Sequence, residues 1–235
     1  MTNSQDTAGT APTSGDAQQG EAQPALVLVN LGTPTAPEPG PVRAFLREFL
    51  SDRRVIEMSP LLWKPILEGI ILRVRPREVS QKYRSIWMDQ GSPLMHFTRE
   101  QARLLGERLP GVRVEVAMRY GQPSIGSVLD RLHVRGVRRV AILPAYPQYA
   151  ASTVATINDA VAQWIGRNRD GFELRLHRSF PAAPAYIEAL ATALERHWER
   201  VGRPNFLTGD RVVVSFHSIP VAMDEAGDPY RAECR

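Results

Sequence analysis

Short apolar runs rich in β-branched residues alternate with longer amphipathic segments along most of this chain. Helical spacing is clear in residues 42–50, where apolar side chains recur at intervals of three and four. The runs of strand length are residues 25–29, 112–118, 138–143, 173–177 and 212–214. Five strands separated by helices predict an α/β fold with a doubly wound parallel sheet and right-handed crossovers.

Capping residues predict where several of the helices begin. Thr98 and Gln101 have the spacing of a capping box, which predicts a helix over residues 98–109. Ser152 is a favourable N-cap for a helix over residues 153–165. Residues 185–201 form a longer amphipathic pattern, so we expect a long helix there.

The last run, Val212 to Val214, leads directly to His217. Three consecutive valines predict a strand that is buried on both faces, as in a parallel sheet. Ligands of open α/β sheets bind at the carboxyl ends of the strands, and imidazole exchanges protons near neutral pH. His217 is therefore a candidate catalytic residue. The alternative is a histidine that only caps its loop through hydrogen bonds.

Residues 1–24 differ in composition from the rest of the chain. They are rich in Thr, Gly, Ala, Gln and Pro, with three acidic residues and no Lys or Arg, which predicts a disordered tail. The tail has neither the basic start and apolar core of a secretory signal nor the arginines of a mitochondrial transit peptide. We therefore expect a cytoplasmic protein.

The charge of the remaining residues favours an anionic partner. They contain 29 basic and 22 acidic side chains, a net charge of about +7. The arginines are dispersed over several predicted helices without a basic run or interleaved aromatic residues, which argues against a nucleic-acid groove. A small anionic ligand or an acidic membrane surface fits better.

Residues 61–72 form an apolar stretch that is interrupted by Lys64 and Glu68 and is too short to span a bilayer. The residue pattern alone favours a helix of the core. The alternative is an apolar lip that touches a membrane surface, and Trp63 beside Lys64 and the arginines that follow support it.

Five motifs in order resemble the ferrochelatase family, whose members complete haem biosynthesis. They are Val-Asn-Leu-Gly-Thr-Pro (29–34), Gly-Ser-Pro-Leu (91–94), Leu-Pro-Ala-Tyr-Pro-Gln-Tyr (143–149), Ser-Phe-His-Ser-Ile-Pro (215–220) and Gly-Asp-Pro-Tyr (227–230). The resemblance covers residues 25–235. It implies a fold of two Rossmann-like domains with a porphyrin in the cleft between them and ferrous iron as the second substrate.

The resemblance also assigns candidate site residues. His217 matches the family's active-site histidine, which takes pyrrole protons or helps to bind the metal. Leu31 and Tyr146 match residues that face the macrocycle, and the apolar residues of 61–72 match a membrane-facing lip. The other porphyrin-contacting matches are Tyr83, Ser92 and, for a propionate group, Arg73 or Arg75.

These residue types suit metal insertion. Two inner N–H groups of a porphyrin must lose their protons for a metal to enter the ring. A neutral imidazole can accept a proton near pH 7. Apolar and aromatic walls hold a large planar ring, while arginine suits carboxylates. Iron is expected as a substrate only, because the single Cys234 cannot by itself ligate a [2Fe-2S] cluster.

The resemblance implies that the chain ends inside a second domain. We expect a tail (1–24), a first chelatase-like domain (25–205) and the start of a second domain (206–235) without the family's acidic partner of the histidine. Glu225 and Asp228 are expected to be structural, and the chain alone is expected to be inactive. Two alternatives remain: a porphyrin or haem carrier without catalysis, and a chelatase for a cobalt-bound tetrapyrrole, which residues 143–149 disfavour.

Overall fold

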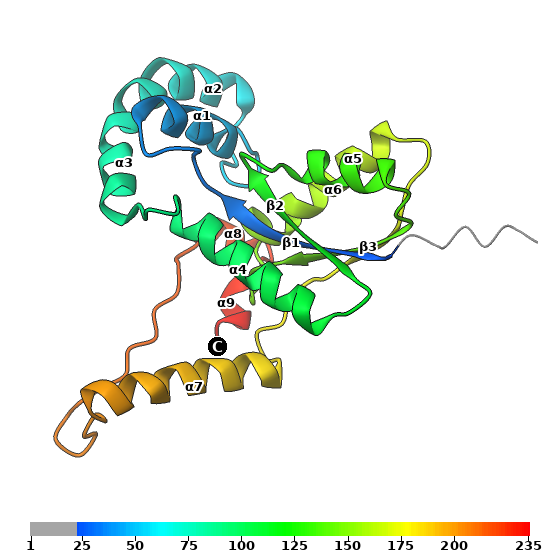
Figure 1. Ribbon diagram of the computed structural model, residues 1–235. Coiled ribbons are helices and arrows are strands. Elements are labelled where there is room, and N and C mark those ends of the chain that lie inside the picture. The colour runs from blue at the N-terminus through cyan, green and yellow to red at the C-terminus, as the bar shows by residue number, and fades with distance from the viewer. Residues whose placement is uncertain (1–22) are drawn as a thin grey trace, which may run out of the picture.

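A four-stranded parallel sheet with helices on both faces forms the centre of the protein in the computed structural model (Figure 1), which describes residues 23–235. The tail predicted for residues 1–24 lies almost entirely outside the described residues. The strands are β1 (Ala25–Gly32), β2 (Arg113–Tyr120), β3 (Arg139–Pro144) and β4 (Glu173–Leu176), in the order β2-β1-β3-β4. The predicted α/β class and parallel sheet are confirmed.

The helices follow the predicted alternation. They are α1 (Pro39–Leu50), α2 (Pro60–Ile66), the π-helix η1 (Leu67–Ile71), α3 (Leu72–Ile86), α4 (Pro93–Arg108), α5 (Ile125–Val134), the π-helix η2 (Ala151–Ala155), α6 (Thr156–Arg167), α7 (Pro184–Val201), α8 (Val221–Glu225) and α9 (Tyr230–Glu233). Helices α5 and α6 cover one face of the sheet, and α4 crosses the other (Figure 1). Helices α1, α2 and α3 form a separate layer beyond the carboxyl end of β1.

The core lies between the sheet and the α5–α6 face. Val27, Val29 and Ile142 point from the strands toward Val128 of α5 and Trp164 of α6, and all five are at most 1% exposed. Alternate residues of a strand point to opposite faces, so the apolar runs of β1 and β3 can serve both layers. This packing fixes the carboxyl ends of β1 and β3 side by side.

Two predicted helix starts are wrong. Helix α4 begins at Pro93 after Ser92, because proline is pre-organised for the first turn. Thr98 is therefore inside the helix, where its hydroxyl donates to the Leu94 carbonyl oxygen at 2.6 Å and accepts from Asn30 at 3.0 Å. Ser152 is not an N-cap, because the π-helix η2 has already begun at Ala151.

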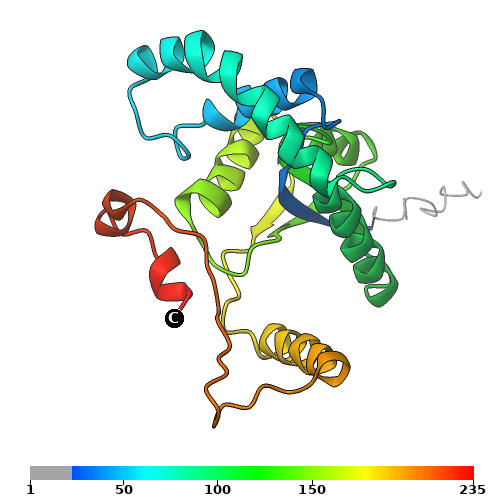
Figure 2. The same cartoon turned by 90° about the vertical axis from the view of Figure 1, so that its left-hand side faces the viewer.

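The predicted fifth strand is also wrong. Residues 212–214 have no strand conformation, and the side chains of Val212, Val213 and Val214 are 45%, 85% and 71% exposed. A strand needs hydrogen-bonding partners along its edges, and no described strand lies beside this segment. Figure 2 shows α7 standing away from the sheet, with an extended connection running from it to α8. The domain boundary expected at residue 205/206 falls in this connection and stays a prediction.

Candidate active site

A cavity of about 400 Å³ lies at the carboxyl ends of β1 and β3, where open α/β sheets bind ligands. One wall comes from β1, from α1 and the loop after it, and from residues 146–153. The other wall comes from residues 217–230. Its lining consists of Leu31, Phe49, Val55, Tyr146, Gln148, Ala150, Ser152, Thr153, His217, Ser218, Ile219, Pro220, Met223 and Tyr230. Three of the predicted site residues, Leu31, Tyr146 and His217, therefore meet in one cavity although they lie far apart in the sequence.

The other predicted site residues lie outside this cavity. Tyr83 packs its ring edge-on against Phe45, with 6.5 Å between the ring centroids, and Arg73 and Arg75 are exposed on α3. Ser92 precedes α4 and lines a separate cavity of about 540 Å³ with Thr33, Trp87 and Arg99 among its other lining residues. Their contact with a porphyrin stays a prediction.

The hydrogen bond of His217 indicates which ring nitrogen is basic. Nδ1 lies 2.6 Å from the carbonyl oxygen of Ser218. A carbonyl oxygen can only accept a hydrogen bond, so we assign the proton of the neutral ring to Nδ1. Nε2 then keeps its lone pair and can accept a proton. The side chain is exposed at the edge of the cavity, where it can reach a ligand.

Tyr146 places an unpaired hydroxyl beside the same cavity. Its oxygen is buried and has no hydrogen-bond partner among the described residues. Burial raises the pKa of Tyr146, and the nearby Tyr120 raises it further. The phenol is therefore neutral at physiological pH, and its hydroxyl is a buried polar group without a partner among the described residues.

A mostly buried carboxylate, Asp52, anchors the wall behind this cavity. Its Oδ2 accepts hydrogen bonds from Arg119 at 2.5 Å, from the Tyr120 hydroxyl at 2.8 Å and from the Thr156 hydroxyl, and its Oδ1 accepts from the Arg54 N–H at 2.8 Å. The Asp52 side chain is 9% exposed. The Asp52 carboxylate thus joins the loop after α1 to the end of β2 and the start of α6.

The charge of Asp52 is stabilised where it lies. Burial alone would raise the pKa of Asp52, but the hydrogen bonds from Thr156, the Arg54 N–H and Tyr120, together with the charge of Arg119, hold it below its ordinary value. The ring of Tyr120 meets that of Phe49 edge-on, with centroids 5.1 Å apart, and Phe49 lines the cavity. The network therefore supports the cavity wall directly.

Comparison with known proteins decides the family. The family model described as Ferrochelatase matches residues 23–235. The chain is 46% identical to Ferrochelatase 1 of Shewanella oneidensis over 215 residues, which are 89% of this chain. This chain belongs to the ferrochelatase family. It is also 47% identical to the ferrochelatase of Azoarcus sp. BH72 over 216 residues, 91% of this chain, and 44% identical to that of Yersinia enterocolitica over 209 residues, 89% of this chain.

The chain spans only part of the length of these ferrochelatases. It covers 63% of the Shewanella protein, 58% of the Azoarcus protein and 63% of the Yersinia protein. Within residues 23–235, His217 belongs to no group of three or more His, Cys, Asp or Glu side chains that could hold a metal ion, and Cys234 is a free thiol. None of the helices described in residues 23–235 is both long and apolar enough to cross a membrane.

Proposed function

We propose that this chain forms part of an enzyme that inserts ferrous iron into protoporphyrin IX to form protohaem. The observation that carries the proposal is the cavity in which His217, Tyr146 and Leu31 meet, in a chain whose described residues all belong to the ferrochelatase family. The relatives' name supports this activity. Neither the cavity nor the comparisons add support for a carrier without catalysis.

The residues of the cavity account for the main demands of the reaction. Leu31, Phe49, Val55 and Met223 offer apolar surface to the porphyrin ring, and Tyr146 adds an aromatic side chain to the wall. As iron enters the ring, two pyrrole protons leave: His217 accepts one of them at Nε2 and the other passes to solvent; alternatively, His217 helps to bind the incoming metal. Iron is thus a substrate that passes through the site.

Porphyrin binding tests the proposal on the chain itself. Adding protoporphyrin IX is expected to quench the tryptophan fluorescence of the chain when the porphyrin binds. Leu31→Glu is expected to weaken this binding at least tenfold, since it places a charge on an apolar wall. Val134→Glu on α5 is the matched control, because Val134 is 87% exposed and does not line the cavity. Absence of quenching by the unaltered chain would contradict the proposal.

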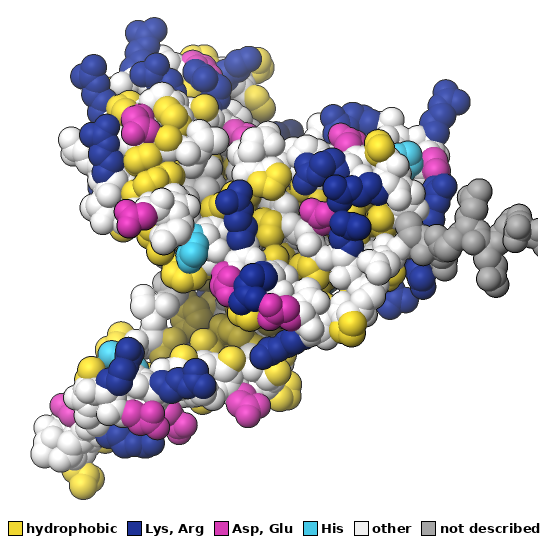
Figure 3. Space-filling model, in the orientation of Figure 1, with side chains coloured by type: hydrophobic (Ala, Val, Ile, Leu, Met, Phe, Trp, Pro, Cys, Tyr) yellow, Lys and Arg dark blue, Asp and Glu magenta, His cyan; other side chains and the backbone are white. Residues whose placement is uncertain are grey.

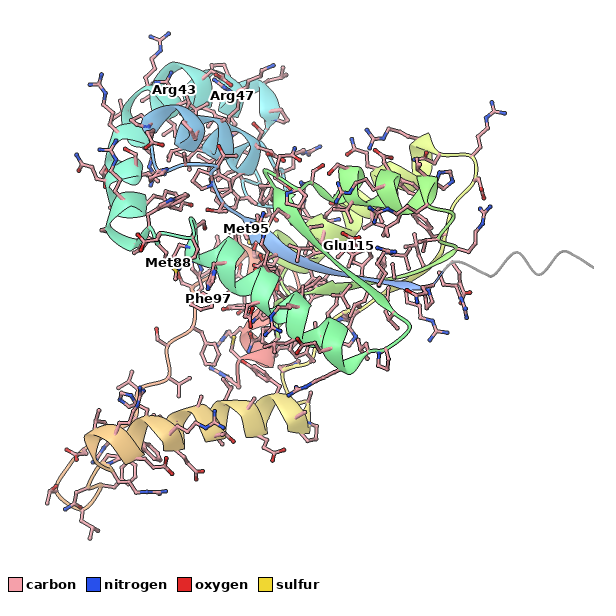
Figure 4. All side chains as sticks on the ribbon, in the orientation of Figure 1. Arg43, Arg47, Met88, Met95, Phe97 and Glu115 are labelled. Carbon is pink, nitrogen blue, oxygen red and sulfur yellow. The ribbon has the colours of Figure 1, made fainter. Side chains whose placement is uncertain are left out.

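We also propose that residues 61–72, together with Val74 on the same helical face, contact a membrane surface. Four apolar side chains spaced by four residues, Leu62, Ile66, Ile70 and Val74, are between 38% and 68% exposed. Leu67 and Leu72 are buried against α1, and Trp63 and Ile71 are partly buried there, so the core-helix alternative fits the inner face of the stretch. Arg47 of α1 pairs with Glu68 at 2.8 Å, which neutralises the acidic residue of the stretch (Figure 4 labels Arg47).

Basic side chains surround the exposed apolar surface. Lys64, Arg73, Arg75 and Arg77 are exposed on the same helices, and Figure 3 shows yellow apolar atoms and dark blue basic atoms side by side over α2 and α3. Apolar burial together with attraction to anionic lipids is the usual basis of peripheral membrane binding.

Vesicle sedimentation tests the membrane proposal. We expect the chain to bind vesicles that contain phosphatidylglycerol more tightly than vesicles of phosphatidylcholine alone. Leu62→Gln with Ile70→Gln is expected to reduce the binding at least tenfold, because both side chains lose apolar contact with the bilayer. Val134→Gln is the control, since this exposed valine lies on α5. Equal binding by the double variant and the unaltered chain would contradict the proposal.

A further inference from the structure

Two carboxylates hold the final segment (residues 217–235) against the loop that follows β3 (residues 145–151). Asp228 accepts a hydrogen bond from the Ala151 N–H at 2.7 Å, and Glu233 accepts one from the Tyr149 N–H at 2.8 Å. Ala150, between these residues, has extended backbone (φ −145°, ψ 152°). In extended backbone the N–H groups of residues two apart point the same way, so both face the final segment.

Further contacts strengthen this attachment. The second oxygen of Glu233 accepts from Arg178 at 2.6 Å, and the guanidinium of Arg178 lies 4.8 Å from the centroid of the Tyr149 ring. The second oxygen of Asp228 accepts from the Tyr230 N–H at 3.0 Å. Burial alone would raise the pKa of Glu233, but the Tyr149 N–H and Arg178 outweigh it and keep the pKa below its ordinary value. Each carboxylate thus uses both of its oxygens.

The attached segment forms one wall of the cavity, and the loop forms part of the opposite wall. Gln148 and Ala150 line the cavity from the loop, while His217, Met223 and Tyr230 line it from the segment. The connection over residues 202–218 is exposed throughout apart from Pro204, so it offers little packing to fix His217. The position of His217 therefore depends on the contacts made after it in the chain.

We propose that Asp228 and Glu233 are positioning residues that clamp the final segment, which carries His217, onto the loop that follows β3, which carries Tyr146. The clamp sets the separation of the two cavity walls, and thereby where His217 presents Nε2. It is specific for carboxylates, because an amide side chain of the same shape keeps only one acceptor oxygen. The clamp extends the proposed function by saying what holds its proton acceptor in place, but it stands on contacts that are independent of that function.

Isosteric variants of the two residues test the clamp. Asp228→Asn and Glu233→Gln, alone and together, each remove one acceptor oxygen. The Ala151 N–H opens a helix and has no partner within it, so only the clamp protects it from solvent. We expect hydrogen exchange at Ala151 and Tyr149 to accelerate at least tenfold in the double variant. Asp224→Asn is the matched control, because it breaks the 2.7 Å pair with Arg231 inside the segment itself.

A second readout follows His217 rather than the stability of the segment. In the variants the ring resonances of His217, assigned by comparison with His217→Ala, are expected to move toward those of the exposed His197 on α7. Asp228→Glu is expected to restore part of the shift, because it brings back both oxygens. Should the double variant fail to fold, the single variants carry the test. Unchanged exchange at Ala151 with an unmoved His217 signal would overturn the clamp.

Porphyrin quenching separates the clamp from the proposed function. If the unaltered chain quenches with protoporphyrin IX, the double variant is expected to bind about tenfold more weakly. If the unaltered chain does not quench, the proposed function fails, while exchange and the His217 signal still decide whether the clamp exists.

Discussion

Replacing His217 with alanine is expected to lower iron insertion by about 10²-fold to 10⁴-fold, the usual contribution of a positioned acid or base. The variant loses the only histidine that lines the cavity in the described residues, and with it the Nε2 lone pair that the Ser218 hydrogen bond leaves free. Porphyrin binding is expected to persist, because Leu31, Phe49 and Tyr146 keep the apolar walls in place. The rate is measured as the loss of protoporphyrin fluorescence after ferrous iron is added.

The assay needs a protein of full family length. Residues 1–235 are joined to the carboxyl-terminal remainder of the Shewanella relative, of which the chain spans 63%. His197→Ala serves as the control, because His197 is an exposed histidine of α7 outside the cavity. A His217→Ala variant with the unaltered rate would rule out His217 as the proton acceptor.

Removing the Asp52 carboxylate is expected to lower the free energy of unfolding by about 3–5 kcal/mol. This is the usual effect of removing one partner of a buried ion pair, because the other charge is left without compensation. In Asp52→Ala, the Tyr120 and Thr156 hydroxyls and the mostly buried Arg119 lose their shared acceptor. A loss of this size is a large part of the 5–15 kcal/mol that typically stabilises a domain. Urea unfolding followed by circular dichroism measures it.

An exposed ion pair nearby provides the comparison. Asp159→Ala removes the partner of Arg54, but both side chains are about half exposed, at 51% and 43%. Such pairs contribute at most about 1 kcal/mol because water screens them. Equal destabilisation by Asp52→Ala and Asp159→Ala would show that the buried network does not anchor the fold.

The Asp52 network also predicts a direction for the effect of pH. The pKa of Asp52 is lower in the folded protein than its ordinary value of 3.8. The stabilisation is therefore fully present above pH 3.8 and is lost as the pH falls through the folded pKa below it. Asp52→Asn, which cannot ionise, is expected to lose less stability than the unaltered chain over the same acid range.

The sequence predicted the α/β class and four of the strands, and the family resemblance placed Leu31, Tyr146 and His217 in one cleft. The strands were predictable because their apolar runs are short and separated by helical patterns that agree with the final packing. Leu31, Tyr146 and His217 were predictable from the family motifs, and the motifs of Leu31 and Tyr146 lie at the ends of β1 and β3. The role of Asp52 was not predictable, because its side-chain partners lie 67 to 104 residues away in the sequence.

The valines before His217 show that a local sequence pattern is not sufficient to predict a strand. Residues 212–214 have the composition of a buried strand, yet burial and pairing depend on a neighbouring strand that the described part of the chain does not supply. The same dependence explains the clamp, since Asp228 and Glu233 gain their role only when the Tyr149 and Ala151 N–H groups are brought opposite them. Sequence determined where most of the helices and strands form and which motifs are candidates for chemistry. Tertiary structure decided which groups are buried and paired, because those contacts join residues that are distant in the chain.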